Sequence, residues 1–219
     1  MELRHPALVE LLQRAYSAER AAALAYVGHA SSLRSRGAGA DPGAIAAVRQ
    51  IEQDEWNHRE HVLVLMRRYG VPVSRFYEVK FLVIGKLIGA SCHVIGRFMP
   101  FFFAGRLESG NVCEYFVMMH HFHSLGIREH DRVLYGMGLK EKEHEIYFLD
   151  QVRSSRWLPF FEWLFSWGRS ASTNDIDLTT PRPISESHRY CRTRVPAGGA
   201  APSVPDASAD GPPAPKAGR

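Results

Sequence analysis

The sequence predicts an all-α protein, built as a four-helix bundle with a long apolar crossover between its second and third helices. Three observations favour this fold class. Four segments carry apolar residues at alternating steps of three and four, the spacing of one face of an α-helix. A highly apolar stretch, residues 81–105, separates the second of these segments from the third. No segment of useful length alternates apolar and polar residues as a strand does.

The first two helices are expected from about Pro6 to Arg34 and from Asp41-Pro42 to Tyr69. Proline suits a first helical turn, and Asp41 is a good cap. Each helix carries charged residues within its apolar stripe, so these residues should face the core. The stripes are Leu12, Tyr16, Glu19, Ala23 and Tyr26 in the first helix, and Ile51, Glu55, His58, Val62 and Leu65 in the second.

The crossover is not expected to span a membrane. Lys86, His93 and Arg97 interrupt it and Pro100 breaks it, so no apolar run approaches the ~18–20 residues that a bilayer needs. It is interpreted as a buried or interfacial connection.

The third helix should continue to about Ser124, and the fourth should begin near Arg128 and run antiparallel to the third. Both again place charged residues among apolar ones. Their stripes are Glu108, Val112, Tyr115, Met119 and Phe122, and Leu134, Met137, Glu141, His144, Phe148 and Gln151.

The charged positions follow the order Glu, Glu-x-x-His, Glu, Glu-x-x-His along the four helices. Helical bundles use this set of residues to hold two bridged metal ions. Carboxylates and imidazoles suit iron or manganese. The sequence therefore predicts a dimetal site, and the alternative is that these are solvated surface residues. The predicted ligands are Glu19, Glu55, His58, Glu108, Glu141 and His144.

Several neighbours of these residues leave alternatives open. Glu114 competes with Glu108 as the ligand from the third helix, and Asp54 is a candidate to orient a ligand histidine across the bundle. Tyr26 and Tyr115 are interpreted as packing residues. Four other glutamates are assigned to the solvated face: Glu52, Glu60, Glu143 and Glu145.

Three regions are expected: the bundle (6–153), a Trp/Phe-rich amphipathic segment (154–169) and a disordered tail (170–219) rich in Pro, Ala, Gly and Ser. The three cysteines form no C-x-x-C pair, and the N-terminus has no signal-peptide pattern, so a cytoplasmic location is expected. The net charge of +4 is scattered, which argues against nucleic acid as a partner.

From about residue 8 to 152 the sequence resembles the demethoxyubiquinone hydroxylases, a branch of the ferritin-like carboxylate-diiron proteins. The similarity lies in SAERAAALAY around Glu19, the DEWNH segment, Glu108 with Tyr115 seven residues later, and EKEH at 141–144. It departs at Glu114, where the family often has a histidine. The resemblance favours Glu108 over Glu114 and implies that Glu19, Glu55, Glu108 and Glu141 hold the catalytic irons.

The resemblance also implies an O₂-dependent monooxygenase of ubiquinone biosynthesis, which takes a lipid-soluble quinone from the inner face of the cell membrane as a peripheral protein. An aromatic face could contact the membrane. The alternative is that this segment and the crossover pack onto the bundle or onto a second copy in a homodimer. A different function is also open: an iron-handling protein, oxidase or peroxidase that does not hydroxylate quinones. The expected aromatic face consists of Trp157, Phe160, Phe161, Leu164 and Trp167.

Overall fold

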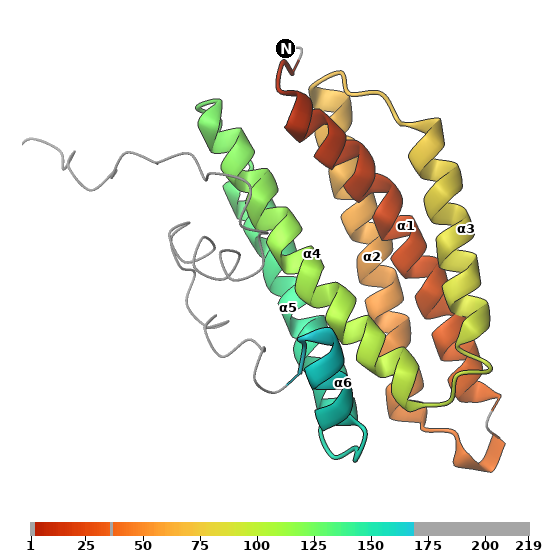
Figure 1. The fold of residues 1–219 in the computed structure, drawn as a ribbon. Helices are drawn as coiled ribbons and strands as arrows, with labels where there is room; N and C mark the ends of the chain where they lie inside the picture. The colour runs from red at the N-terminus through yellow and green to blue at the C-terminus, as the bar shows by residue number, and fades with distance from the viewer. Residues whose placement is uncertain (1–2, 36, 169–219) are drawn as a thin grey trace, which may run out of the picture.

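A computed structural model describes residues 3–35 and 37–168 (Figure 1). These residues form six α-helices and one 3₁₀ turn with no strand among them, which confirms the all-α prediction. The predicted tail lies outside the described residues. The elements are α1 (Pro6–Arg34), η1 (Gly37–Gly39), α2 (Pro42–Arg68), α3 (Arg75–Ser91), α4 (Phe98–Ser124), α5 (Asp131–Val152) and α6 (Leu158–Phe165).

Side-chain caps fix where the first three helices begin. The His5 Nδ1 atom accepts a hydrogen bond from the Leu8 amide at 3.1 Å, and Asp41 accepts one from the Ala44 amide at 3.0 Å. Ser74 caps α3 in the same way. Each cap satisfies an amide that has no partner within its helix. The expected starts of the first two helices are therefore confirmed.

The long helices lie side by side, with α1 packed against α2 and α4 against α5 (Figure 1). α1 also contacts α3 and α4. The apolar interior forms two clusters. The first cluster includes Leu8, Leu12, Met66, Phe122 and Leu134, and the second includes Val48, Phe101, Phe102, Phe148 and Leu149. On each of α1, α2, α4 and α5 the predicted ligands lie in sequence between residues of the first cluster and residues of the second.

Residues 81–105 do not form a single element. They comprise the second half of α3, the turn after it and the start of α4. α3 approaches α1 so closely that a β-carbon at Gly28 would lie 2.3 Å from the Cα atom of Gly89, and one at Gly85 would lie 2.6 Å from the Ala21 carbonyl oxygen. Glycine at these positions lets the two backbones touch, which positions α3 along α1.

A polar junction joins the other end of α3 to α1 and α2. The Glu78 carboxylate accepts hydrogen bonds from Ser17 Oγ at 2.8 Å, Arg20 Nη1 at 3.0 Å and Arg59 Nη2 at 2.9 Å. Burial alone would raise the pKa of Glu78. The bonds from Arg59 and Ser17 and the two arginine charges lower it instead. The ionised carboxylate thus holds three helices together at neutral pH.

The outer face of α3 is apolar and exposed. Phe76 and Leu87 are 70% and 66% exposed, and Val79 and Val83 lie on the same side of the helix. No helix in the described part of the chain is long and apolar enough to cross a membrane.

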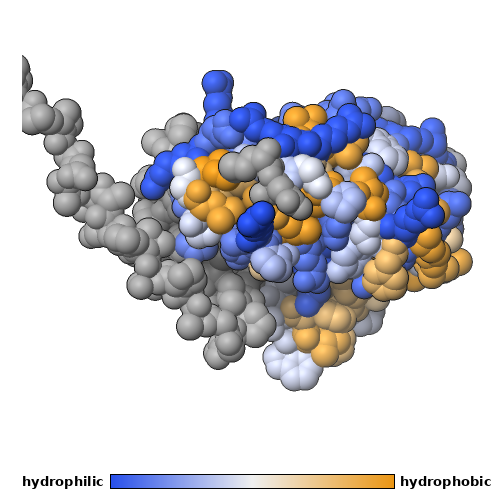
Figure 2. All heavy atoms as spheres, turned by 90° about the horizontal axis from the view of Figure 1, so that it is seen from above, coloured by the Kyte–Doolittle hydropathy of each residue, from blue (hydrophilic) through white to orange (hydrophobic). Residues whose placement is uncertain are grey.

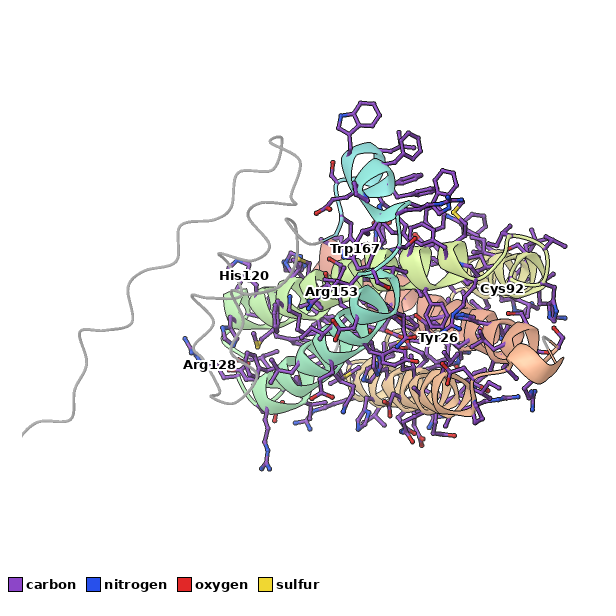
Figure 3. The ribbon with its side chains drawn as sticks, turned by 90° about the horizontal axis from the view of Figure 1, so that it is seen from below. Tyr26, Cys92, His120, Arg128, Arg153 and Trp167 are labelled. Carbon is purple, nitrogen blue, oxygen red and sulfur yellow. The ribbon has the colours of Figure 1, made fainter. Side chains whose placement is uncertain are left out.

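Two residues of the expected aromatic face, Trp167 and Phe161, are not exposed as expected. Trp167 is buried, and its indole N–H donates to Glu145 Oε1 at 2.8 Å (Figure 3). Its ring fills the space over Gly105, where a β-carbon would be only 2.3 Å away. Phe161 is half-buried between Phe98 and Phe102. Trp157, Phe160 and Leu164 are exposed as expected, and Trp163 is more exposed still, at 78%.

Glu145 does not belong to the solvated face, because it is fully buried. Its second carboxylate oxygen lies 3.4 Å from the Nζ atom of Lys142, which is also buried. Glu145 and Lys142 therefore do not face solvent. Of the other glutamates assigned to the solvated face, Glu60 and Glu143 are exposed as expected, and Glu52 is partly buried.

The contact between α1 and α3 predicts opposite effects of alanine at two glycines. Gly28→Ala should lower the free energy of unfolding by about 1–3 kcal/mol, because its β-carbon meets backbone that cannot move alone. Gly136→Ala in α5 should raise it by about 0.5–1 kcal/mol, because nothing lies within 4 Å of the new atom. Urea unfolding of both variants measures the difference. Equal effects would contradict the close α1–α3 contact.

Candidate metal centre

The six predicted ligands converge in the middle of the molecule. They form two groups, and in each group one ligand atom per residue lies within 4.8 Å of every other. All six residues are buried. Glu55 from α2 and Glu141 from α5 belong to both groups. The first group is completed by Glu19 and His58, and the second by Glu108 and His144.

Helical periodicity explains the convergence. Within Glu55/His58 and Glu141/His144 the residues are three apart, so each pair leaves its helix in one direction. His58 Nδ1 lies 2.7 Å from Glu141 Oε1, and His144 Nδ1 lies 3.5 Å from Glu55 Oε1. Each imidazole of one Glu-x-x-His pair thus faces a carboxylate of the other pair.

The site holds many buried polar atoms without a hydrogen-bond partner. Buried oxygen and nitrogen atoms are normally satisfied, and leaving one unsatisfied costs about 1–3 kcal/mol or more. Bound cations would satisfy all of these atoms at once, so the residues fit a metal centre. The unsatisfied atoms are Glu19 Oε2, both carboxylate oxygens of Glu55 and of Glu141, and the Nδ1 atoms of His58 and His144.

The electrostatics lead to the same conclusion. Burial raises the pKa of Glu19 well above its ordinary value, and the charges of Glu55 and Glu141 add to this effect. Burial and Glu141 likewise raise the pKa of Glu108. Burial alone would lower the pKa of His144, but its hydrogen bond to Asp54 and the nearby carboxylates raise it. The metal-free cluster must therefore take up protons. Two divalent cations would balance four carboxylates without them.

Two tyrosines connect α1 and α4 across the site through hydrogen bonds. The Tyr26 hydroxyl on α1 donates to Glu108 on α4, and the Tyr115 hydroxyl on α4 donates to Glu19 on α1. Each tyrosine follows the glutamate of its own helix by seven residues, and bonds the glutamate of the other helix. The interpretation of these residues as packing side chains is therefore incomplete. The repeated seven-residue spacing was the sequence signal for this role.

Other polar residues orient two ligands from outside. Asp54 Oδ2 lies 3.1 Å from His144 Nε2, which confirms the expected contact across the molecule. This bond leaves Nδ1 of His144 directed at the site, as in metal centres where a carboxylate holds the distal ring nitrogen. Asn111 Nδ2 donates to Glu108 Oε2 at 3.0 Å.

The structure separates the two candidates from the third predicted helix. Glu108 lies within the second ligand group, while Glu114 belongs to neither group. Glu114 instead lies 3.5 Å from Arg14 on α1. Burial raises the pKa of Glu114, and Arg14 opposes the shift. Glu108 is thus the residue that the geometry offers as a ligand.

Comparison with protein-family models, curated proteins and solved structures finds no match to this chain. The geometry therefore carries the assignment: buried clusters of glutamate and histidine that could hold a metal ion. Glu55 and Glu141 belong to both clusters, so each would be available to two ions if two were bound.

The geometry predicts a specific pattern of metal content. Purified protein reconstituted with ferrous iron should hold two ions per chain, one for each ligand group. Glu141→Ala removes a ligand that both groups share, so this variant should hold less than one iron ion per chain. Glu114→Ala should keep two, because Glu114 is outside both groups. Elemental analysis measures the content, and loss of iron in both variants alike would contradict the assignment.

The hydrogen bonds from Tyr26 and Tyr115 predict that a variant without one of them folds normally but binds iron more weakly. Tyr115→Phe frees Glu19 to rotate away, so iron should bind about 10–100-fold more weakly. Tyr77→Phe is the matched control, because its hydroxyl bonds the exposed Glu10 away from the site. Competition with a chelator measures affinity, and circular dichroism checks the fold. Equal affinity for iron in both variants would show that the tyrosine hydroxyl does not position the ligand.

Proposed function

We propose that this protein is a ferritin-like four-helix bundle in which α1, α2, α4 and α5 hold two irons and α3 lies within the long apolar crossover. The observation that supports the proposal is the pair of buried ligand groups that share Glu55 and Glu141. The residues suit iron or manganese alike, since both accept carboxylate and imidazole ligands. The sequence resemblance to the demethoxyubiquinone hydroxylases favours iron.

The proposed reaction is O₂-dependent hydroxylation of a quinone-type lipid. A diiron centre, when bound, supplies the activation of O₂ that the side chains cannot perform. The protein contributes the rest. Glu55 and Glu141 fix the separation of the two positions, and the apolar clusters on either side exclude water. Tyr26 and Tyr115 hold the outer carboxylates in place through their hydroxyl protons.

A lipid substrate is supported by exposed apolar surface on two elements. Trp157, Phe160 and Trp163 project from the α6 region, and the outer face of α3 adds Val83 and Leu87. In-plane aromatic residues of this kind favour the boundary between lipid headgroups and acyl chains. The proposed location is therefore the cytoplasmic face of the cell membrane, with the protein attached peripherally.

Deletion of the gene tests the function directly. Quinone profiling by mass spectrometry should show accumulation of a precursor that lacks one hydroxyl group. Wild-type protein should restore the profile, and Glu141→Ala should not, because it lacks a ligand of both groups. Trp163→Glu should restore it poorly while keeping its iron, because Trp163 is exposed and far from any ligand contact.

The control for the membrane variant is Ala46→Glu, which also places a charge on an exposed apolar residue but on α2, outside both apolar surfaces. It should restore the profile fully. An unchanged quinone profile in the deletion strain, together with two irons per chain, would favour an iron-handling protein, oxidase or peroxidase instead. Less than about one metal ion per chain would refute both functions.

A further inference from the structure

The end of the molecule opposite α6 is rich in arginine. It comprises the start of α1, the α2–α3 loop and the α4–α5 loop, and Figure 2 looks down on it, where hydrophilic residues surround smaller hydrophobic patches. Three carboxylates are present in its residues, 3–10, 64–75 and 121–135. Six arginines of these ranges are exposed: Arg4, Arg67, Arg68, Arg75, Arg128 and Arg132.

The carboxylates of this end are already engaged. Glu129 pairs with Arg68 at 2.7 Å, Asp131 lies 2.5 Å from His123 Nε2, and Glu10 accepts a hydrogen bond from Tyr77. Within residues 3–35 and 37–168, the other five arginines of this end form no ion pair. Among the described residues, this end therefore carries more positive than negative charge, and five of its arginines are not paired with a carboxylate.

The composition of this end fits a protein partner better than a lipid surface. Arginine is enriched in protein interfaces, and apolar residues form their centres. Here Val73, Leu125 and Val133 are each about 40% exposed among the arginines. Tryptophan, which favours the lipid headgroup boundary, does not occur in these ranges, and neither does lysine, which is depleted in protein interfaces. The exposed tryptophans lie at the other end. Charge complementarity then requires a partner with an acidic surface.

This end is also close to the proposed metal centre. His58 precedes Arg67 by nine residues on α2, which is about 14 Å along a helix. Beneath the arginines, the rings of Tyr69 and His130 lie 5.4 Å and 4.9 Å from Phe122. These side chains are continuous with the apolar cluster that contains Tyr115, which bonds Glu19.

We propose that the arginine-rich end is the docking surface for a small acidic electron-transfer protein that reduces the metal centre. This inference rests on the proposed function. Insertion of one oxygen atom into a C–H bond and release of the other as water consumes O₂, two electrons and two protons. Two one-electron transfers from the reduced acidic protein, which is oxidised, supply the electrons, and solvent supplies the protons.

The test uses the full-length, iron-loaded protein and a small acidic [2Fe–2S] protein as the probe. Its oxidation is followed by stopped-flow absorbance without O₂, and binding of its oxidised form is followed by calorimetry. Arg67→Glu/Arg132→Glu should lower the second-order rate about tenfold or more at low salt, and the wild-type rate should fall steeply with added salt. The control is Arg34→Glu/Arg156→Glu, which reverses two exposed arginines at the opposite end and should change the rate less than about twofold.

Two further measurements separate the possible failures. Dithionite should reduce the bound iron of the wild type and of both double variants at the same rate. This result would show that the substitutions leave the metal centre intact. If the protein holds no iron, the proposed function fails, whereas binding still reports on the surface alone. Equal rates in the two double variants, a rate independent of salt, or binding without oxidation of the probe would each overturn the docking proposal.

Discussion

The burial of four carboxylates in an apolar interior is the constraint on which the rest of this structure depends. Each carboxylate costs several kcal/mol to bury when unpaired, and here four come from four different helices. They lie between two apolar clusters, so no helix can turn its carboxylate outward without also exposing the apolar residues of the same stripe. Packing thus forces the charges together, and only cations placed among them relieve the repulsion.

Tyr26 and Tyr115 show how hydrogen bonds between helices hold part of the carboxylate cluster in place. Glu19 and Glu108 each contribute to one ligand group only, and each is held by a tyrosine from the other's helix. Glu55 and Glu141 contribute to both groups, and the polar groups near their oxygens are themselves predicted ligands, such as His58 and His144. Hydrogen bonds within the protein therefore orient Glu19 and Glu108. Glu55 and Glu141, which belong to both groups, remain available to a metal ion. This division follows the order of the ligands in the sequence, because the single glutamates are the ones held by tyrosine and the glutamates of the Glu-x-x-His pairs are the shared ones.

Much of this arrangement could be predicted because it depends on local rules. Helical periodicity placed Glu19, Glu55 and Glu141 on inward stripes, and caps such as Asp41 located helix starts. The failures involve contacts that no local rule encodes. The burial of Trp167 depends on space above Gly105, two helices away in the sequence.

The same reason explains Glu145 and α3. Glu145 follows the ligand His144 by one residue and is buried, because its carboxylate accepts a hydrogen bond from the buried Trp167. The prediction assigned Glu145 to solvent because nothing in the sequence shows that Trp167 covers it. The second half of α3 lies inside the apolar stretch that was interpreted as one connection, and Gly85 and Gly89 are the positions that let it lie against α1. A glycine in a helix is informative only once its neighbour is known.

The distribution of side chains along the long axis gives the molecule two unlike ends. Exposed tryptophan lies at the α6 end, and arginine that forms no ion pair among the described residues lies at the other, with the carboxylate cluster buried between them. A lipid-soluble substrate and a water-soluble reductant would then approach from opposite directions, so neither would block the other. A storage protein for dissolved iron would need no such asymmetry, since all of its reactants arrive from water. The two unlike ends therefore agree with the proposed function, in which a membrane-borne compound reacts with electrons from a reductant in solution.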